Sequence, residues 1–188
     1  MDRIPFQATT AGAIYERVAE LPVEIVLDNV RSMYNVGAFF RTADAAAIEK
    51  LWLCGITACP PKKEIAKTAL GAEETVPWEH SADAASVVRR RREAGCEIAA
   101  VETSNHAVDL FDWMPRFPVC VVFGHEVDGV AREVADLCDT HVRIPMLGKK
   151  HSLNVATAGG VVIYELLRKY RELFVHFRTV GYRHPQRT

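Results

Sequence analysis

The sequence VCVVFGHEVDGV, residues 119–130, joins an apolar run to a turn that is rich in glycine and acidic residues. The run consists largely of β-branched and aromatic residues, which is typical of a strand buried on both faces. Helix-like stretches separate it from the other apolar runs, at residues 23–28, 50–55, 97–102 and 141–145. Strands that alternate with helices imply βαβ units. We therefore expect an α/β fold with a mostly parallel sheet and helices on both faces.

The helical pattern and the chain length indicate one domain. Apolar residues recur at helical spacing in residues 10–20, 35–48, 63–71, 82–94, 130–138 and 152–174. No repeat or low-complexity linker divides the chain, and 188 residues is an ordinary length for a single domain. We expect one domain over residues 1–188, with a helical N-terminal extension over about 1–22 and a basic C-terminal tail over about 175–188.

The composition excludes several classes of protein. No apolar run approaches the ~20 residues that a membrane-spanning helix requires, and 49% of the residues are apolar, as in soluble globular proteins. The five cysteines lack C-x-x-C spacing and nearby histidines, so we expect a reduced interior and no metal. The first residues lack the basic and apolar regions of a secretory signal, which predicts a cytoplasmic protein.

The formal net charge of −1 argues against a protein that coats nucleic acid nonspecifically. The charge is unevenly distributed, because the sequence from Arg168 onward is rich in arginine and contains one acid, Glu172. This tail has two interpretations. It contacts RNA through Arg178, Arg183 and Arg187, or it is a frayed, dispensable terminus.

The first strand-to-helix junction contains Asn35, Gly37 and Arg41. Asn35 is a suitable N-cap, and the apolar stripe that follows it leaves Arg41 off the buried face. Because Gly37 lies one turn before Arg41, we expect the guanidinium to pass over it toward Asn35, where an RNA phosphate would bind. Taken alone, the pattern is more typical of a cap, a packing glycine and a solvated arginine. Tyr34 either stacks on an RNA base or, as we favour, is buried beside Phe39.

The second junction has the pattern Gly124-x-Glu126-x-x-Gly129. A dinucleotide-binding loop requires glycine where Glu126 stands, and the carboxylate of Glu126 would repel a pyrophosphate. The junction therefore suits a ligand without phosphates, such as the nucleoside sulfonium S-adenosylmethionine. The alternative is an ordinary acidic turn in which Gly129 adopts a left-handed conformation.

The third junction, residues 144–165, combines a strand, a loop containing Gly148 and a long helix that Ser152 can cap. The sequence ATAGG at residues 156–160 is unfavourable in a helix unless the backbone packs closely against another element. We expect that element to be a second subunit or a threaded loop. The alternative is a core helix with a flexible kink.

Taken together, NVGAFFRTADA, VVFGHEVDGV and IPMLGKKHSLNVATAGGVVIYE resemble, in this order, motifs of the SpoU/TrmH family of RNA ribose 2′-O-methyltransferases in the SPOUT superfamily. The similarity runs from about Val23 to Tyr170. It implies a deep C-terminal trefoil knot, a homodimer, and S-adenosylmethionine held in the knot loops mainly by backbone groups and converted to S-adenosylhomocysteine. The implied cofactor-binding residues are Thr103, Gly124, Ile144, Met146, Ser152 and Leu153.

The resemblance also implies catalytic roles, with Arg41 of one subunit near the methyl donor of the other. We expect Asn35 to orient Arg41, and the site to be shaped by Glu126, Ser152 and Asn154. The RNA partner is structured, with transfer RNA favoured over ribosomal RNA because no additional RNA-binding domain precedes the first strand. Two alternatives stay open: a knotted RNA-binding protein without catalysis, and a knotted methyltransferase that acts on an RNA base.

Overall fold

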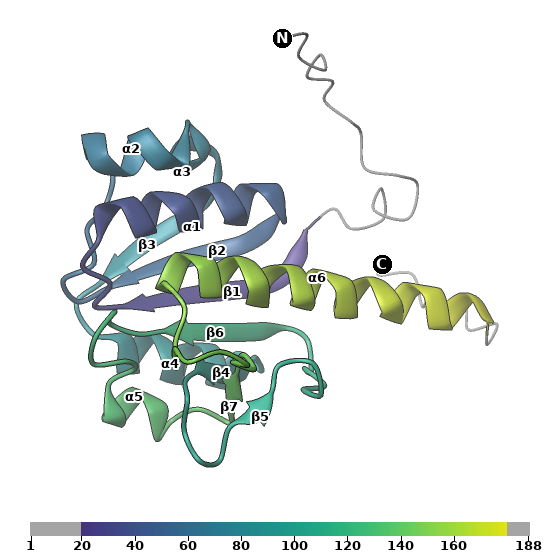
Figure 1. Cartoon of the computed structure of the whole chain (residues 1–188). Helices are drawn as coiled ribbons and strands as arrows, with labels where there is room; N and C mark the ends of the chain where they lie inside the picture. Colours follow the sequence, from purple (N-terminus) through teal and green to yellow (C-terminus); the bar gives the residue numbers. More distant parts are fainter. Residues whose placement is uncertain (1–19, 180–188) are drawn as a thin grey trace, which may run out of the picture.

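A parallel sheet forms the centre of the computed structural model, which describes residues 20–179 (Figure 1). Its seven strands follow the order β3-β2-β1-β6-β4-β7-β5. All of the paired strands are parallel. The strands are β1 Leu21–Asp28, β2 Ile48–Cys54, β3 Trp78–Ser81, β4 Glu97–Val101, β5 Val108–Asp109, β6 Val119–Phe123 and β7 Thr140–Arg143.

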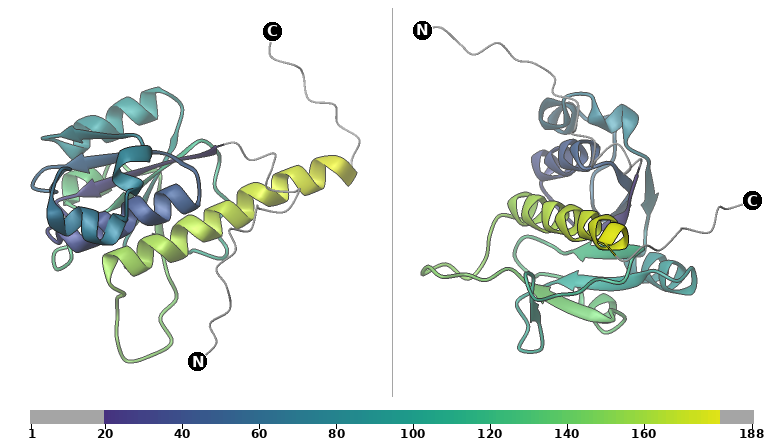
Figure 2. Two further views of the ribbon diagram at one scale, coloured as in Figure 1. Left: turned by 90° about the horizontal axis from the view of Figure 1, so that it is seen from above. Right: turned by 90° about the vertical axis from the view of Figure 1, so that its right-hand side faces the viewer.

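Helices cover both faces of this sheet, as the sequence predicts (Figures 1 and 2). The helices are α1 Met33–Ala45, α2 Lys63–Ala69, α3 Ala72–Thr75, α4 Ala84–Glu93, α5 Arg132–Ala135 and α6 Val155–Thr179. One core cluster joins the sheet to α1, α2 and α6, and the other joins it to α4 and α5. Alternation along β1 explains the two clusters, because Ile25 and Leu27 belong to the first and Val26 to the second.

The structure differs from the sequence prediction at several boundaries. The short strands β3 and β5 were not predicted, because β3 is largely polar and β5 has two residues. The helix predicted over 63–71 is confirmed as α2 but ends at Ala69, because Leu70 and Gly71 have φ angles of 56° and 95°, and the short helix α3 that follows was not predicted. α1 ends at Ala45 rather than at residue 48, and Ala47 has a φ of 52°.

Parts of the predicted termini lie outside the described residues. Residues 10–19 of the predicted first helix are among them, and so is most of the predicted N-terminal extension; Leu21 and Pro22 belong to β1 instead. α6 continues to Thr179, beyond the predicted end at residue 174. Of the three C-terminal arginines proposed to bind RNA, Arg183 and Arg187 lie outside the described residues, and so does the side chain of Arg178.

The described helices, strands and side chains also show what residues 20–179 do not contain. None of the helices there is both long and apolar enough to cross a membrane. That part of the chain also has no cluster of three or more His, Cys, Asp or Glu side chains arranged to hold a metal ion. All five cysteines are free thiols. Burial raises the pKa of the Cys54 and Cys138 thiols to about 12.

The sheet brings the three junctions together at the carboxyl ends of its strands. In a parallel sheet all strands end on the same side, and β1, β6 and β4 are direct neighbours in this one. α1 follows β1, and α6 begins after the loop that leaves β7. Figure 2 shows α6 running beside α1 and projecting past the sheet. The loops that contain the three sequence motifs therefore meet where parallel sheets usually bind ligands.

Candidate active site

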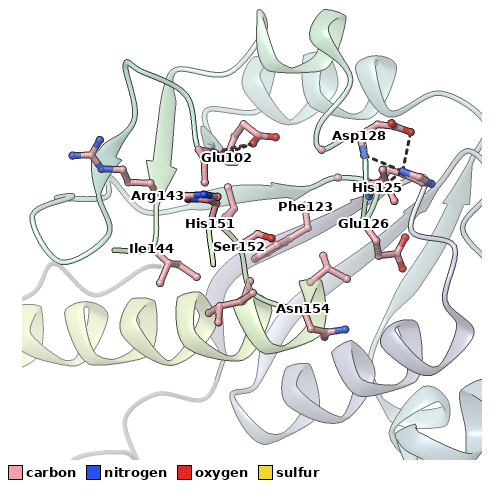
Figure 3. A pocket seen from close by; sticks show the side chains of 18 of the residues that line it. Glu102, Phe123, His125, Glu126, Asp128, Arg143, Ile144, His151, Ser152 and Asn154 are labelled. Atoms are coloured by element: carbon pink, nitrogen blue, oxygen red, sulfur yellow. Dashed lines mark hydrogen bonds and ion pairs between the residues drawn. The ribbon is translucent and has the colours of Figure 1, made fainter. Parts of the chain in front are cut away.

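A cavity of about 400 Å³ lies where these loops meet (Figure 3). Its walls come from residues 101–103, 123–129, 142–144 with Met146, 151–155 and Ala158. These segments follow the carboxyl ends of β4, β6 and β7 or begin α6. The volume is within the range of pockets that hold small molecules.

The cavity brings together all six residues that the family resemblance implies for cofactor binding. Thr103, Gly124, Ile144, Met146, Ser152 and Leu153 all line it. Glu126 and Asn154 line it too, whereas Asn35 and Arg41 do not. Sequence reasoning missed Glu102, Arg143 and His151 among the lining residues. An acidic residue directly after a strand was the available signal for Glu102.

The turn after β6 is closed by backbone contacts at its two ends. The amides of His125 and Gly129 each donate to the other residue's carbonyl oxygen, at 2.9 Å. Gly129 has a φ of 73°, the left-handed conformation that the alternative interpretation of this turn included. A Cβ atom on Gly124 would lie 2.1 Å from the carbonyl carbon of Gly129. Both glycines are therefore needed for this tight turn, which fixes the wall of the cavity.

The carboxylate of Glu126 ties this turn to the loop before α1. It accepts hydrogen bonds from the backbone amides of Arg31 and Ser32 and from Nδ2 of Asn35, all at 3.0 Å. Partial burial would raise the pKa of Glu126, but these donors outweigh it and hold the pKa below its usual value. Glu126 is therefore an ionised anchor for the start of α1.

The side chain of Asn35, in the first sequence motif, makes hydrogen bonds to residues of the second and third motifs. Its Nδ2 donates to Glu126, and its Oδ1 accepts from Nδ2 of Asn154 at 3.2 Å. The predicted role of Asn35 as an N-cap is wrong. The cap is Ser32, whose hydroxyl accepts from the Asn35 amide, because α1 begins two residues earlier than expected. Asn35 therefore lies within the first turn, where its side chain is free to make these tertiary contacts.

Asn154 holds the start of α6. Its Oδ1 accepts from the amides of Ala156 and Thr157, at 2.9 and 3.2 Å. The prediction that Ser152 caps this helix is wrong, because α6 begins at Val155 and the capping position is Asn154. Ser152 instead lies in the cavity wall (Figure 3). One asparagine thus both caps α6 and donates to Asn35.

Arg41 is exposed on α1, away from its own subunit's cavity. It has no hydrogen-bond or ion-pair partner within the described part of the chain. The predicted path of its guanidinium over Gly37 is wrong, since a Cβ on Gly37 would lie 2.1 Å from Oγ1 of Thr68 in α2. Gly37 is covered by α2 and leaves no space there for Arg41.

Tyr34 lies on the same exposed stripe of α1 as Arg41, seven residues or about two turns away. Its predicted burial beside Phe39 is wrong, because Tyr34 is 49% exposed. The ammonium of Lys67 in α2 lies 5.9 Å from the centroid of its ring. The tyrosine is therefore accessible for contact with another molecule.

Of the two glycines in α6, Gly159 packs closely against another element, as expected, but that element is α1 of the same chain. A Cβ on Gly159 would lie 2.3 Å from the ring of Phe39 in α1 of the same chain. Phe39 also packs against Phe123, with ring centroids 5.1 Å apart. The expected partners, a second subunit or a threaded loop, are therefore wrong for Gly159. A Cβ on Gly160 would meet nothing within 4 Å.

Comparison with known proteins finds relatives over most of the chain. Residues 22–164 match the family model described as the SpoU rRNA Methylase family. The chain is 34% identical over 151 residues to the 23S rRNA (guanosine-2′-O-)-methyltransferase RlmB of Vibrio parahaemolyticus serotype O3:K6, a match that covers 80% of this chain and 60% of that protein.

Solved structures of RNA methyltransferases resemble the fold of this chain. The AdoMet-bound rRNA methyltransferase from Sinorhizobium meliloti superposes with a TM-score of 0.74 at 30% identity, covering 80% of this chain and 56% of that one. A structure described by its 2-OH methylation of C/U34 on tRNA gives a TM-score of 0.72 at 26% identity, covering 80% and 97%. The chain spans 60% to 63% of the length of three curated relatives that it matches. With the family model matched from residue 22 to residue 164 and residues of the second and third motifs gathered at one cavity, the chain belongs to the SpoU rRNA methylase family.

Proposed function

We propose that this protein transfers a methyl group from S-adenosylmethionine to a ribose 2′-hydroxyl of structured RNA. One observation carries the proposal: hydrogen bonds join Glu126 to Asn35 and Asn35 to Asn154, one residue from each sequence motif, beside the cavity. A second cavity, also of about 400 Å³, lies next to the first and is lined by Arg31, Ser32, Asn35 and residues 125–127. We assign the first cavity to the cofactor and the second to the target nucleotide, with Glu126 in the shared wall.

The residues present fit S-adenosylmethionine. The carboxylates of Glu102, Glu126 and Asp128 line the first cavity and disfavour a ligand with phosphates. They suit a nucleoside that carries positive charges. Two solved relatives are described as bound to AdoMet, the enzyme from Sinorhizobium meliloti and AviRb from Streptomyces viridochromogenes. In this chain, Thr103, Gly124, Ile144, Met146, Ser152 and Leu153 would hold the cofactor.

The cofactor supplies an electrophilic methyl group on a sulfonium. The protein must then orient the ribose hydroxyl, provide a route for its proton and exclude water. We assign the fixed geometry to Asn35 and Asn154, which are held by Glu126 and by the α6 amides. Arg41 clamps an RNA phosphate and the 2′-oxygen. The hydroxyl proton passes to that phosphate, or to an Arg41 that has transiently lost its own proton.

The position of Arg41 supports our proposal of a homodimer. It lines neither cavity of its own chain, and it lies on the exposed face of α1. Tyr34 on that face and Tyr164 on the adjacent helix α6 are 49% and 50% exposed. We propose that α1 and α6 of two protomers pack together, so that Arg41 of each protomer acts at the cavity of the other. One alternative explanation, that Arg41 is only a solvated surface charge, predicts a protein that does not need a partner.

The deep trefoil knot is also part of the proposal. The chain forms β4, passes to the sheet edge as β5, returns to the centre as β6 and then inserts β7 between β4 and β5. This order is compatible with a chain that threads past its own earlier loops, as a knot requires, although knots are rare in proteins. Membership of the family supports the same arrangement.

Transfer RNA is our proposed substrate class. The chain covers 97% of the relative described for methylation of tRNA, but only 60% of the 23S rRNA enzyme. We propose a cytoplasmic enzyme, because the relatives are named as bacterial tRNA and rRNA methyltransferases, and bacteria make these RNAs in the cytoplasm.

The decisive experiment incubates the protein with labelled S-adenosylmethionine and total RNA from a host strain that lacks the gene, and then analyses the labelled nucleosides by RNA size class. Label in a 2′-O-methylnucleoside of tRNA is the expected result. A labelled 2′-O-methylnucleoside in rRNA would show that the substrate is rRNA and not tRNA. Label in a base would show that the enzyme methylates an RNA base and not a ribose. Cofactor binding without label in any RNA class would favour a knotted RNA-binding protein without catalysis.

A further inference from the structure

Glu102 is an acidic residue that neither the family motifs nor the proposed mechanism uses. It comes directly after β4, the neighbour of β6 in the sheet, and its side chain lines the cofactor cavity. Oε1 accepts a hydrogen bond from the Thr103 amide at 2.8 Å, and Oε2 accepts one from the Val130 amide at 3.1 Å. The carboxylate is thus held in place by the loops that follow β4 and β6.

The turn after β6 leaves space for this carboxylate. Gly129, at a φ of 73°, has no side chain on the side that faces Glu102, and a Cβ there would lie 2.3 Å from Oε2. Any other residue at position 129 would displace the carboxylate from the cavity wall. Figure 3 shows Glu102 on the opposite side of the cavity lining from Ile144 and Asn154.

The Glu102 carboxylate keeps some acceptor capacity after its contacts with the protein. An ionised carboxylate accepts about four hydrogen bonds and donates none. The Glu126 carboxylate already receives three donors from the α1 region. Asp128 pairs with His125 at 3.0 Å, and its side chain is 82% exposed. Glu102 receives two amides and a longer contact from the Thr103 hydroxyl at 3.4 Å, all from the protein side of the wall.

A carboxylate at this place is chemically matched to a vicinal diol. Two adjacent hydroxyl groups offer two donors, and in other parallel sheets an acid at a strand end accepts from a nucleotide ribose. We infer that Glu102 binds the 2′- and 3′-hydroxyls of the cofactor's ribose and so selects a ribonucleoside over its deoxy counterparts. This inference rests on the proposed function for the identity of the cofactor.

The test measures binding alone, without RNA or turnover. S-adenosylhomocysteine and its 2′-deoxy and 3′-deoxy analogues are titrated calorimetrically into the full-length protein and into Glu102→Gln. Loss of a hydroxyl should weaken binding to the unmodified protein by about tenfold or more, as expected for a hydrogen bond to a charged group. In Glu102→Gln the parent ligand should bind about tenfold more weakly, and the penalty for the missing hydroxyl should fall to about twofold.

Matched variants separate this role from a structural one. Asp128→Asn removes another carboxylate from the same cavity and should keep the full discrimination against deoxy ligands. Glu102→Asp keeps the charge but withdraws it by one methylene group, and it should lose discrimination even if Glu102→Gln does not fold. Equal binding of ribose and deoxyribose ligands by the unmodified protein would overturn the inference alone, and so would full discrimination in folded Glu102→Gln or Glu102→Asp. If the unmodified protein binds none of the ligands, the proposed cofactor is wrong and the inference falls with it.

Discussion

Among single residues, Glu126 joins the turn after β6 to the start of α1. Hydrogen bonds from Arg31, Ser32 and Asn35 lower its pKa against the opposing effect of burial. The folded protein therefore binds a proton here less tightly than the unfolded chain. A group of this kind contributes stability that is fully present above its unfolded pKa and is lost as the pH falls through its folded pKa.

We expect Glu126→Gln to flatten the acid side of the stability profile. Above the ordinary glutamate pKa of 4.5 the variant should be less stable than the unmodified protein by a constant amount. Below that pH the difference should narrow, because the native carboxylate becomes protonated and loses its advantage. Urea unfolding at a series of pH values from about 7 to about 3 measures this. Profiles that stay parallel over the whole range would contradict the assigned role of the charge.

Arg41 is exposed and lies outside the cofactor cavity, so its substitution should affect turnover without affecting cofactor binding. Arg41→Ala should lower turnover by about 10²-fold or more while leaving cofactor affinity unchanged, because Arg41 does not line the cofactor cavity. Arg41→Lys should restore little, since an ammonium cannot bind phosphate with the planar fork of a guanidinium. Single-turnover kinetics and calorimetry separate the two effects. Arg89→Ala, an exposed arginine on α4, is the control, and normal turnover in both Arg41 variants would refute the role.

At the scale of elements, the packing of α6 on α1 is set by one glycine. Gly159 faces the buried ring of Phe39, whereas its neighbour Gly160 faces open space. Both residues are equally unfavourable for the helix by propensity, at roughly 1 kcal/mol relative to alanine. Only their tertiary surroundings distinguish them.

These two glycines give a paired prediction. Gly159→Ala should destabilise the protein by about 1–3 kcal/mol, because the new methyl group overlaps a ring that other core residues hold in place. Gly160→Ala should stabilise it by up to about 1 kcal/mol, since helix propensity improves without a clash. Thermal and urea unfolding provide both values. Equal effects at the two positions would show that α6 does not approach α1 as closely as the structure has it.

At the start of α6, Asn154 has two roles: it caps the helix, and it donates a hydrogen bond that positions Asn35. Asn154→Asp should keep nearly normal stability, because an aspartate also caps a helix, but it should lower turnover since it cannot donate to Asn35. Asn154→Ala should lose both functions and about 1 kcal/mol of stability. Unfolding measurements and turnover on the same samples compare the two variants. Full activity in Asn154→Asp would exclude the Asn35 contact from catalysis.

At the scale of the whole molecule, the central question is which chain supplies Arg41 to a given cavity. The described fold places Arg41 outside both cavities of its own chain, while Glu126 lines both. If each site combines residues of two protomers, a dimer of two different inactive chains contains one intact site.

Mixing therefore tests the composite site. Arg41→Ala and Glu126→Ala should each be nearly inactive, and refolding them together should restore about a quarter of the normal activity, because half of the random dimers hold one intact site. Sedimentation at working concentrations should show a dimer for each variant. No recovery in mixtures that are demonstrably dimeric would mean that Arg41 acts within its own chain.

The sequence by itself determined the features that depend on local sterics. Runs such as residues 119–123 form strands because β-branched side chains favour extended backbone, and alternation with helices makes the sheet parallel. Gly129 can adopt its positive φ because glycine has no Cβ to forbid it. The residues implied for cofactor binding also meet at one cavity, since all parallel strands end at the same edge of the sheet.

Only the tertiary structure decided which nearby polar residue takes which role. Ser32 rather than Asn35 caps α1, and Asn154 rather than Ser152 caps α6, because packing sets where each helix begins and a cap follows that boundary. The strand β3 exists because β2 pairs with it, and Gly159 is needed because Phe39 lies against it. A chain pattern identifies which residues can make a contact, but the energy of the contact depends on a partner that is distant in the sequence and is brought near only by folding.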